Sequence, residues 1–367
     1  MINSLSQEGG DSSTNIQARE MVVHIGVDEK RAREIYQEMN LLARHDFSKE
    51  AQKIANARVK KFENSLISKI EQVDGALEAF ADPSFQLLLV EAQKTAASTE
   101  RPKDYDLLSE LLIHRFQKGQ NRIARAGISV AVGIVDKISD EALLGLTVAH
   151  AVSTFSPISG SIAQGLNILN DLFGKIFYDE LPAGNDWLDH LDLLNAVRLN
   201  SFGNFKKVHQ YYPERLSGYV DVGINKKSEN HNKAVEILNN NNLPINTLID
   251  TVDSDFSRLI FCSRNTINAA TVERQVTHDD RLTIISNKLS EAQIIAIDSV
   301  YNLYHVDENL KQKNTNLFMA EWDKWQNLKT LTQWWDNIPK SFIITAAGKA
   351  LAHSNAQRCD ESLPALD

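Results

Sequence analysis

The sequence predicts a mainly α-helical fold, a multi-helix bundle with a long N-terminal helical hairpin and a smaller C-terminal helical module. Three observations support this prediction. Only 8 prolines and 16 glycines occur in 367 residues, which favours long helices over many short strands. Apolar residues recur at steps of three and four along much of the chain. Several of these apolar runs follow a residue that caps helices well.

The chain is longer than one hydrophobic core usually grows, so we expect more than one structural unit. We divide it into a flexible tail (1–18), a long helical hairpin (19–81), a helical core domain (82–225) and a mostly helical C-terminal module (226–367). Its 43% hydrophobic and 24% charged residues are ordinary for a globular protein and exclude wholesale disorder.

The hairpin is expected to contain a first helix from Asp28 and a longer one opened by Ser48. In the second helix, apolar residues from Val59 to Phe80 form one stripe on a helix of about 50 Å. The stripe either packs within its own chain or forms an oligomer interface. The candidate interface residues are Phe62, Leu66, Ile70, Val73 and Leu77.

The core domain is predicted to open with a helix capped by Asp82, with Pro83 at its first position. Residues 84–137 then form a tight helical array, and Ser139 caps the next helix. The segment 142–170 has no charged residue and exceeds the ~20 residues of a membrane span. Pro157 and Gly160 divide it into two shorter pieces. We therefore expect buried core helices, with a membrane-inserting hairpin as the alternative.

Towards the C-terminus we expect a helix through WLDHLDLLNAVRL, followed by an irregular aromatic and basic run. Residues 228–281 are Asn-rich, with one helix at NHNKAVEILN. Ser290 and Gln293 predict a capping box, and residues 316–336 predict one helix rich in tryptophan. The segment SFIITAAGKALAHSN predicts a short strand that turns into a helix capped by Thr345.

The overall charge limits the classes of partner. A formal charge of −9 and a pI near 5.6 disfavour a general polyanion binder. Cys262 and Cys359, far apart in sequence, suit a reducing compartment and predict neither a disulfide framework nor a zinc finger. The first twenty residues lack the basic and apolar regions of a secretory signal. We therefore expect a cytoplasmic protein.

Motifs for catalysis or for phosphate binding by a glycine-rich loop are missing from the sequence, so we predict no catalytic residue, no metal and no cofactor. The densest titratable cluster is Asp186, Asp189, His190 and Asp192. It is either an acidic helix start, favoured by the helix dipole, or a metal site. A second cluster, His278, Asp279 and Asp280, is either a solvated turn or a further metal candidate.

Two basic runs are candidate sites for phosphate or nucleic acid. Arg115, Lys118, Arg122 and Arg125 recur at steps of three and four and share one helical face if Gly119 does not break the helix. The other run combines Tyr211 and Tyr212 with Lys206, Lys207 and Arg215. The alternative is that these cations pair with carboxylates of neighbouring helices.

Several segments resemble a known group of proteins. The segments DPSFQLLLVEAQKTAAST, LLSELLIHR, KISDEALLGLTVAH and ITAAGKALAHSN are similar to helical bacterial proteins of the Abi-alpha type, which are associated with abortive infection and phage defence. The strand-to-helix pattern at Thr345 and Gly348 also resembles the last wing of winged-helix domains, which implies a DNA-binding or protein-docking module.

Taken together, these features predict a non-enzymatic helical interaction protein, a sensor, scaffold or effector subunit in bacterial anti-phage defence. We expect a protein partner or self-association. The alternatives are a nucleic-acid or nucleotide binding module acting through the basic runs, and a membrane-perturbing effector acting through residues 142–176. A further alternative is a hydrolase that uses a metal at Asp186, Asp189 and His190.

Overall fold

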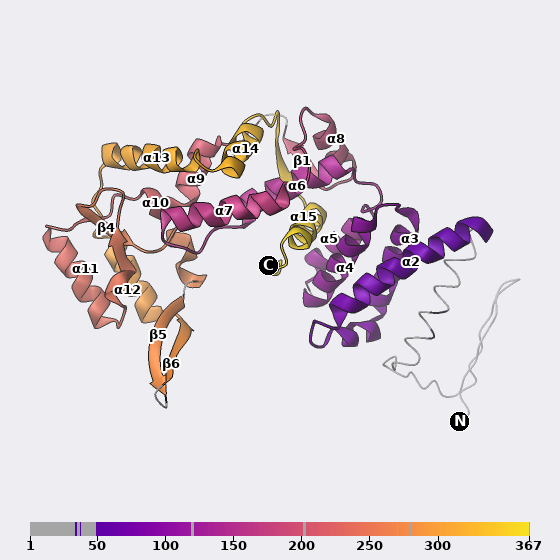
Figure 1. Ribbon diagram of the computed structural model, residues 1–367, viewed down its shortest axis with the longest axis horizontal. Helices are drawn as coiled ribbons and strands as arrows, with labels where there is room; N and C mark the ends of the chain where they lie inside the picture. Colours follow the sequence, from indigo (N-terminus) through magenta and orange to yellow (C-terminus); the bar gives the residue numbers. More distant parts are fainter. Residues whose placement is uncertain are drawn as a thin grey trace, which may run out of the picture.

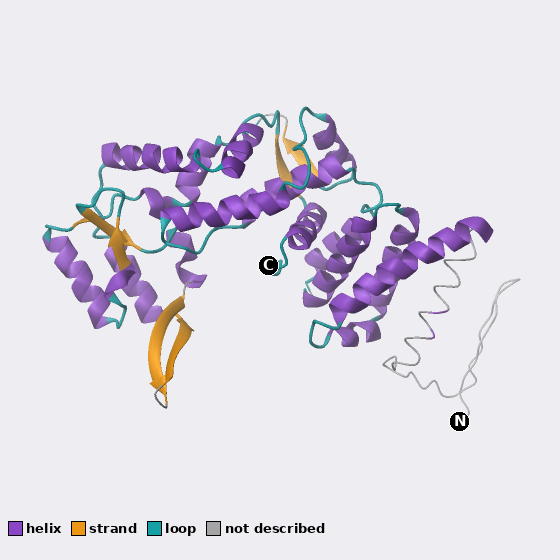
Figure 2. Ribbon diagram, viewed as in Figure 1, coloured by secondary structure: helices purple, strands orange, loops and turns teal. Residues whose placement is uncertain are grey.

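The structure is a computed structural model that describes residues 34, 37, 49–118, 121–200, 203–269, 271–278 and 281–366. The predicted tail and most of the first hairpin helix lie outside the described residues. The protein is mainly α-helical, as predicted (Figures 1 and 2). Among the described residues, no helix is both long and apolar enough to cross a bilayer.

The α-helices are α2 (Lys49–Ile70), α3 (Pro83–Ser98), α4 (Pro102–Gln117), α5 (Arg122–Val132), α6 (Asp140–Thr154), α7 (Ile162–Ile176), α8 (Asp186–Leu193), α9 (Val208–Arg215), α10 (Ser217–Val220), α11 (Glu229–Asn240), α12 (Glu291–Tyr301), α13 (Glu308–Trp322), α14 (Gln326–Trp335) and α15 (Ala346–Cys359). The strands are β1 (Val197–Asn200), β2 (Ile224–Asn225), β3 (Leu248–Asp250), β4 (Phe256–Leu259), β5 (Thr271–His278), β6 (Arg281–Lys288) and β7 (Ser341–Ile344). The 3-10 helices are η1 (Ala76–Ala81), η2 (Ile245–Thr247) and η3 (Arg264–Ala269).

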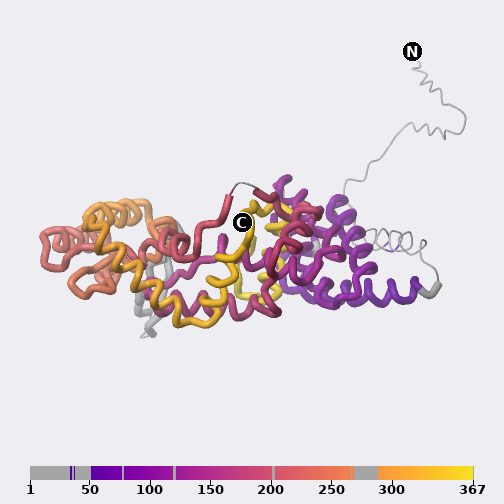
Figure 3. The backbone as a smooth tube through the Cα atoms, turned by 90° about the horizontal axis from the view of Figure 1, so that it is seen from above, coloured from indigo at the N-terminus to yellow at the C-terminus, as the bar shows by residue number. Residues whose placement is uncertain are grey.

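The molecule is elongated and has two hydrophobic cores. Helices α2–α5 lie at one end, the lobe of α11, α12 and the β5–β6 hairpin lies at the other, and α6 and α7 run between them (Figures 1 and 3). The first core is built from α2–α10 and α13–α15, and the second from the segment 224–300. The second core begins at Ile224, and the chain returns to the first core from α13 onwards.

The apolar stripe of the N-terminal region packs inside its own chain. Phe62, Leu66 and Ile70 are 0, 3 and 4% exposed and belong to the first core, where α2 packs on α3 and α4. The helix is shorter than predicted: its 22 residues span about 33 Å and end at Ile70. A turn and η1 follow, with Gly75 at φ +75°, so the stripe does not continue on one helix. Val73 is half-buried, and the side chain of Leu77 lies outside the described set.

Local capping signals fix where the helices of the core begin. The Asp82 carboxylate accepts from the Ser84 amide at 2.9 Å, and Pro83 takes the first helical position, where no amide donor is needed. Ser139 accepts from the Ala142 amide at 3.2 Å at the start of α6. Both predicted helix starts are confirmed, as is the helical array of residues 84–137.

The uncharged segment forms α6, a loop and α7. Every residue of α6 from Ala142 to Val152 is buried, which confirms the predicted core helix. The second helix is amphipathic: Leu166 and Phe173 are 0% exposed in the core, whereas Ile168 is 45% exposed. Packing against neighbouring helices therefore accounts for the apolar character of α6 and for the buried face of α7.

A buried ion pair joins α4 to the start of α6. The Arg101 guanidinium donates to the Asp104 carboxylate at 2.9 Å, to the Ile138 and Val135 carbonyls at 2.7 and 2.6 Å, and to Asp140 at 2.8 Å. The Asp104 side chain is 0% exposed, and its burial raises its pKa even though Thr99 and Arg101 favour the charged form. Arg101 therefore supplies the positive charge that offsets the free-energy cost of burying the Asp104 carboxylate.

We predict that Arg101→Ala lowers the free energy of unfolding by about 3–5 kcal/mol, because it leaves Asp104 buried without a countercharge. Denaturant unfolding measures this loss. The control is Lys94→Ala, which removes an ion pair to Glu91 whose side chains are 57 and 51% exposed. That change should cost less than about 1 kcal/mol. Equal costs for the two variants would contradict the assignment.

A short antiparallel sheet positions the last helix. Strand β1 pairs with β7 in the register Val197↔Ile344 to Asn200↔Ser341. The helix predicted through WLDHLDLLNAVRL is too long, because α8 ends at Leu193 and Asn195 adopts φ +58° before the strand. The predicted strand-to-helix turn is confirmed: Thr345 Oγ1 accepts from the Gly348 amide at 3.1 Å. A Cβ on Gly348 would lie 2.0 Å from the Ala196 carbonyl oxygen, so this crossing requires glycine.

The second core combines two helices with a three-stranded sheet of order β2–β4–β3. The predicted capping box of Ser290 and Gln293 is confirmed at the start of α12, and the predicted helix at NHNKAVEILN is α11. The strands were not predicted from this Asn-rich segment. Strand β4 contacts loop 157–160, because Arg258 donates to the Gly160 carbonyl at 2.6 Å. Cys262, which belongs to the first core, donates from Sγ to the Pro157 carbonyl of the same loop at 2.9 Å.

Candidate functional site

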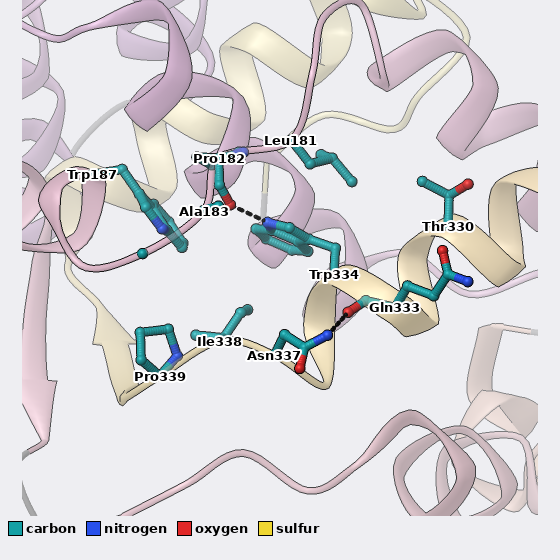
Figure 4. A pocket seen from close by; sticks show the side chains of 11 residues that line it. Leu181, Pro182, Ala183, Trp187, Thr330, Gln333, Trp334, Asn337, Ile338 and Pro339 are labelled. Carbon is teal, nitrogen blue, oxygen red and sulfur yellow. Dashed lines mark hydrogen bonds between the residues drawn. The ribbon is translucent and has the colours of Figure 1, made fainter.

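A pocket of about 400 Å³ opens between the loop before α8 and the C-terminal half of α14 (Figure 4). Its volume lies within the range of ordinary ligand sites. One wall comes from the loop and α8, and the other from α14 and the segment that leads to β7. The lining residues are Leu181, Pro182, Ala183, Gly184, Trp187, Thr330, Gln333, Trp334, Asn337, Ile338 and Pro339.

A break in the tryptophan-rich segment places α14 at this pocket. The single helix predicted for residues 316–336 is in fact two, because α13 ends at Trp322 and α14 begins at Gln326. The Trp322 indole, 0% exposed, donates to the Leu328 carbonyl at 3.2 Å and to the Thr332 hydroxyl at 2.9 Å. The buried indole therefore ties the start of α14 back onto the end of α13.

Two indole rings form the aromatic part of the lining. The ring centroids of Trp187 and Trp334 are 5.8 Å apart with planes inclined at 36°, and Trp187 meets Phe342 of β7 edge to face at 6.0 Å. The Trp334 indole N–H donates to the Pro182 carbonyl at 2.8 Å, as Figure 4 shows. Because this donor is satisfied and Trp187 is only 4% exposed, both rings are held in place before any ligand arrives.

The lining side chains carry no ionisable group. They offer aromatic rings and alkyl groups, and their polar atoms are the two indole N–H groups and those of Thr330, Gln333 and Asn337. The Asn337 amide donates to the Gln333 carbonyl at 2.7 Å, while the Gln333 side chain is exposed. Such a surface buries an apolar group and orients it with a few hydrogen bonds, which is the chemistry of binding rather than of proton transfer.

The four cations of the first basic run do not share one helical face. Helix α4 ends at Gln117 and α5 begins at Arg122, so Lys118 and Arg122 lie at a helix end and a helix start. Arg115 is 5% exposed and donates to Asp82 at 3.2 Å and to Ser84 at 2.8 Å. Arg125 donates to the same serine hydroxyl.

Asp82 shows the effect of these two guanidinium groups. Burial alone raises the pKa of Asp82, but hydrogen bonds from Ser84 and the charges of Arg115 and Arg125 outweigh it and lower the pKa. Two of the four cations are therefore engaged in holding α3, α4 and α5 together. Lys118 is half-buried and Arg122 is exposed.

The second basic run is also engaged within the chain. Lys206 pairs with Glu214 at 2.5 Å, and Lys207 donates to the main-chain oxygen of Asp336. Arg215 donates to the Phe155 carbonyl at 3.5 Å. These cations connect α9 with neighbouring segments instead of forming a separate basic surface.

The predicted acidic cluster does not assemble a metal site. His190 Nε2 accepts from the Ser139 amide at 3.2 Å, Asp192 accepts from the Leu199 amide at 3.4 Å, and Asp189 lies 4.0 Å from Lys340. Across the described part of the chain, no group of three or more metal-ligating side chains is close enough to hold an ion. His278 pairs with Arg281 at the end of the β5–β6 hairpin, and Asp279 and Asp280 lie outside the described residues.

Sequence analysis did not anticipate a chain of three buried histidines. His114 of α4, His150 of α6 and His353 of α15 are 1, 2 and 1% exposed. The His150 Nε2 and His353 Nδ1 atoms are 3.1 Å apart, and His353 Nε2 lies 2.9 Å from the Pro364 carbonyl oxygen. The rings of His114 and His353 pack at a centroid distance of 5.4 Å.

The partners fix which nitrogen of each ring carries the proton. A carbonyl only accepts, so His353 Nε2 donates to Pro364; the neutral ring then accepts at Nδ1 from His150 Nε2. His150 Nδ1 in turn accepts from the Thr154 hydroxyl, at 3.2 Å. His114 donates from Nε2 to the Gln357 side-chain oxygen at 2.5 Å and accepts at Nδ1 from Ser354 at 2.9 Å. All three rings are therefore satisfied as neutral imidazoles with the proton on Nε2.

This arrangement disfavours protonation. Burial lowers the pKa of His114 to about 4 and that of His150 to about 3, and the neighbouring His353 adds to both shifts. These folded-state values lie below the ~6.5 of an unfolded histidine, so the unfolded chain binds more protons between them. Ionisation of His114 and His150 therefore costs the fold nothing above about pH 6.5, and it destabilises the fold increasingly as pH falls below that value.

We predict that the free energy of unfolding falls by about 1.4 kcal/mol per pH unit for each of His114 and His150 between about pH 6 and 4.5. Denaturant unfolding at a series of pH values measures the slope. In His150→Gln the slope should be smaller by that amount. Equal slopes in the wild type and in His150→Gln would refute the assignment.

Comparison with known proteins places the chain in a family. A family model whose description is only a "-like" label, naming no activity, matches residues 26–363. The chain belongs to this family. The matched range includes both hydrophobic cores, the pocket and the three histidines. No curated protein and no solved structure matches the chain.

Proposed function

We propose that this chain is a helical interaction protein that binds a partner protein at the α8–α14 pocket and acts in the bacterial cytoplasm in defence against phage. The observation that carries the proposal is the pocket itself, with its two indole rings and uncharged lining. The defence context rests on the resemblance of the helical segments to Abi-alpha proteins. In that setting the chain serves as a sensor, scaffold or effector subunit.

The composition of the pocket favours a protein partner. Tryptophan is enriched among the residues that dominate binding energy at protein interfaces, especially where it is rigidly held beside a concave surface. Trp334 meets this description, because its N–H is bonded to Pro182 and its ring packs against Trp187. Gln333 and Asn337 supply amides at the mouth, where hydrogen bonds orient a bound chain.

We propose the pocket as the binding surface in place of the apolar stripe of α2, which the sequence analysis offered as a candidate interface. Phe62, Leu66 and Ile70 are buried within the chain, so a partner reaches them only if α2 separates from α3 and α4. The pocket is accessible without any such rearrangement. A binding role therefore requires no unfolding of the first core.

We predict that a photo-crosslinking amino acid at Gln333 forms a covalent adduct with one discrete host protein, identified by mass spectrometry. The same amino acid at Gln326, exposed on α14 but not part of the lining, should form no such adduct. Filling the mouth by Ala183→Gln should abolish the adduct, whereas Ala126→Gln, at an exposed position on α5, should not. An adduct that persists in Ala183→Gln would contradict the proposal.

We predict that the chain protects its host from phage through the same pocket. Cells that carry the wild-type gene or Ala126→Gln should show reduced phage plating, and cells with Ala183→Gln should lose that protection at equal protein levels. Protection that is independent of Ala183 would remove the pocket from the defence role. The prediction of a non-enzymatic protein would be overturned if the purified chain cut nucleic acid or turned over nucleotide and lost that activity on mutation of one site.

A further inference from the structure

Acidic residues lie close in sequence to the residues that line the uncharged pocket. Five carboxylates lie within two positions of a lining residue, namely Asp179, Glu180, Asp186, Asp189 and Asp336, compared with two ammonium groups, Lys329 and Lys340. The residues that flank the lining in sequence therefore carry an excess of negative charge. That excess agrees with the formal charge of −9 for the whole chain.

Four of these carboxylates have no cation within ion-pair distance in the described part of the chain, and three of the four are exposed. Asp189 lies 4.0 Å from Lys340, and Asp336 accepts from the Val208 amide at 2.9 Å. Asp179, Glu180 and Asp186 are exposed, and in the described part of the chain none of them has a cation within ion-pair distance. They lie just before and just after the loop that forms one wall of the pocket.

We infer that the pocket takes a basic peptide segment of the partner, with one bulky apolar side chain in the pocket and Lys or Arg residues beside it. The inference rests on the proposed function and names the partner's chemistry. The apolar anchor packs against the Trp334 ring and Ile338, where the lining offers no charge. The flanking cations face Asp179, Glu180 and Asp186 on the loop side.

Charge complementarity selects this occupant over the other candidates. Exposed carboxylates attract a cationic segment during diffusion and repel acidic ones, so they set specificity and association rate more than raw affinity. Nucleic acid is disfavoured for the same reason, since its phosphates need cations. A neutral apolar molecule would fill the pocket but would gain nothing from the three carboxylates.

Selection of short random peptides displayed on phage tests the inference with the full chain. Three targets are compared: the wild type, Ala183→Gln, and a neutralised variant that combines Asp179→Asn, Glu180→Gln and Asp186→Asn. The wild type should enrich peptides with one bulky apolar residue beside Lys or Arg. Ala183→Gln should enrich none of these, and the neutralised variant should retain the apolar preference but lose the basic one.

The best peptide is then titrated by fluorescence anisotropy. Its affinity for the wild type should fall about tenfold when salt is raised from low to several hundred millimolar, because exposed charges are screened. The neutralised variant should bind more weakly at low salt and show little salt dependence. Since the three substitutions are at exposed positions, they should lower the unfolding midpoint only slightly, mainly through Asp186 in the first turn of α8.

The results of the peptide selection and of the crosslinking experiment together distinguish a failure of this inference from a failure of the proposed function. Pocket-dependent peptides that are neutral or acidic would overturn the basic-segment inference and leave partner binding at the pocket standing. No pocket-dependent peptide, together with a discrete adduct at Gln333, would also overturn it, because the partner would then present a folded surface. Failure of both the selection and the crosslinking would overturn the inference and the proposed function together.

Discussion

The fold depends on a polar seam inside the first core, where α15 meets α4 and α6. His353, Ser354 and Asn355 of this helix are 1, 0 and 0% exposed, and each has a hydrogen-bonding partner on another segment. A buried polar group left without a partner costs far more than its bond contributes, so the seam tolerates only one relative placement of these elements. The last helix of the chain thereby fixes helices that precede it by about two hundred residues.

The walls of the pocket are held in place by elements that connect them to this seam. Helix α15 follows β7 directly, β7 pairs with β1, and β1 follows α8, which carries Trp187. On the other side, α14 carries Trp334 and leads into the same strand. Both walls are thus connected through one two-stranded sheet to α15, which buried hydrogen bonds hold against α4 and α6. A preorganised site of this kind loses little conformational entropy when a ligand binds.

Local chemistry was predictable from the sequence, and long-range packing was not. Asp82, Ser139, Ser290 and Thr345 cap helices where the sequence predicts, because capping involves residues only a few positions apart. The β1–β7 pairing and the polar seam join segments far apart in sequence. The spacing of residue types along the chain does not predict such contacts. The β5–β6 hairpin had a local signal, since two residues separate its strands, but its Asn-rich surroundings favoured a loop. The tryptophans near α14 were visible as an aromatic cluster, whereas their pocket arises from a helix break that Trp322 stabilises.

Packing within the chain also determines which features of the sequence are still available to bind a partner. The apolar stripe of α2 and two cations of the first basic run, Arg115 and Arg125, are engaged in joining neighbouring helices. The uncharged segment supplies a core helix that is buried along most of its length. After folding, the α8–α14 pocket combines the half-buried ring of Trp334 with nearby carboxylates that have no ion-pair partner among the described residues. Because the rings are neutral and the charges beside them are negative, the pocket is complementary to a segment that is both apolar and cationic.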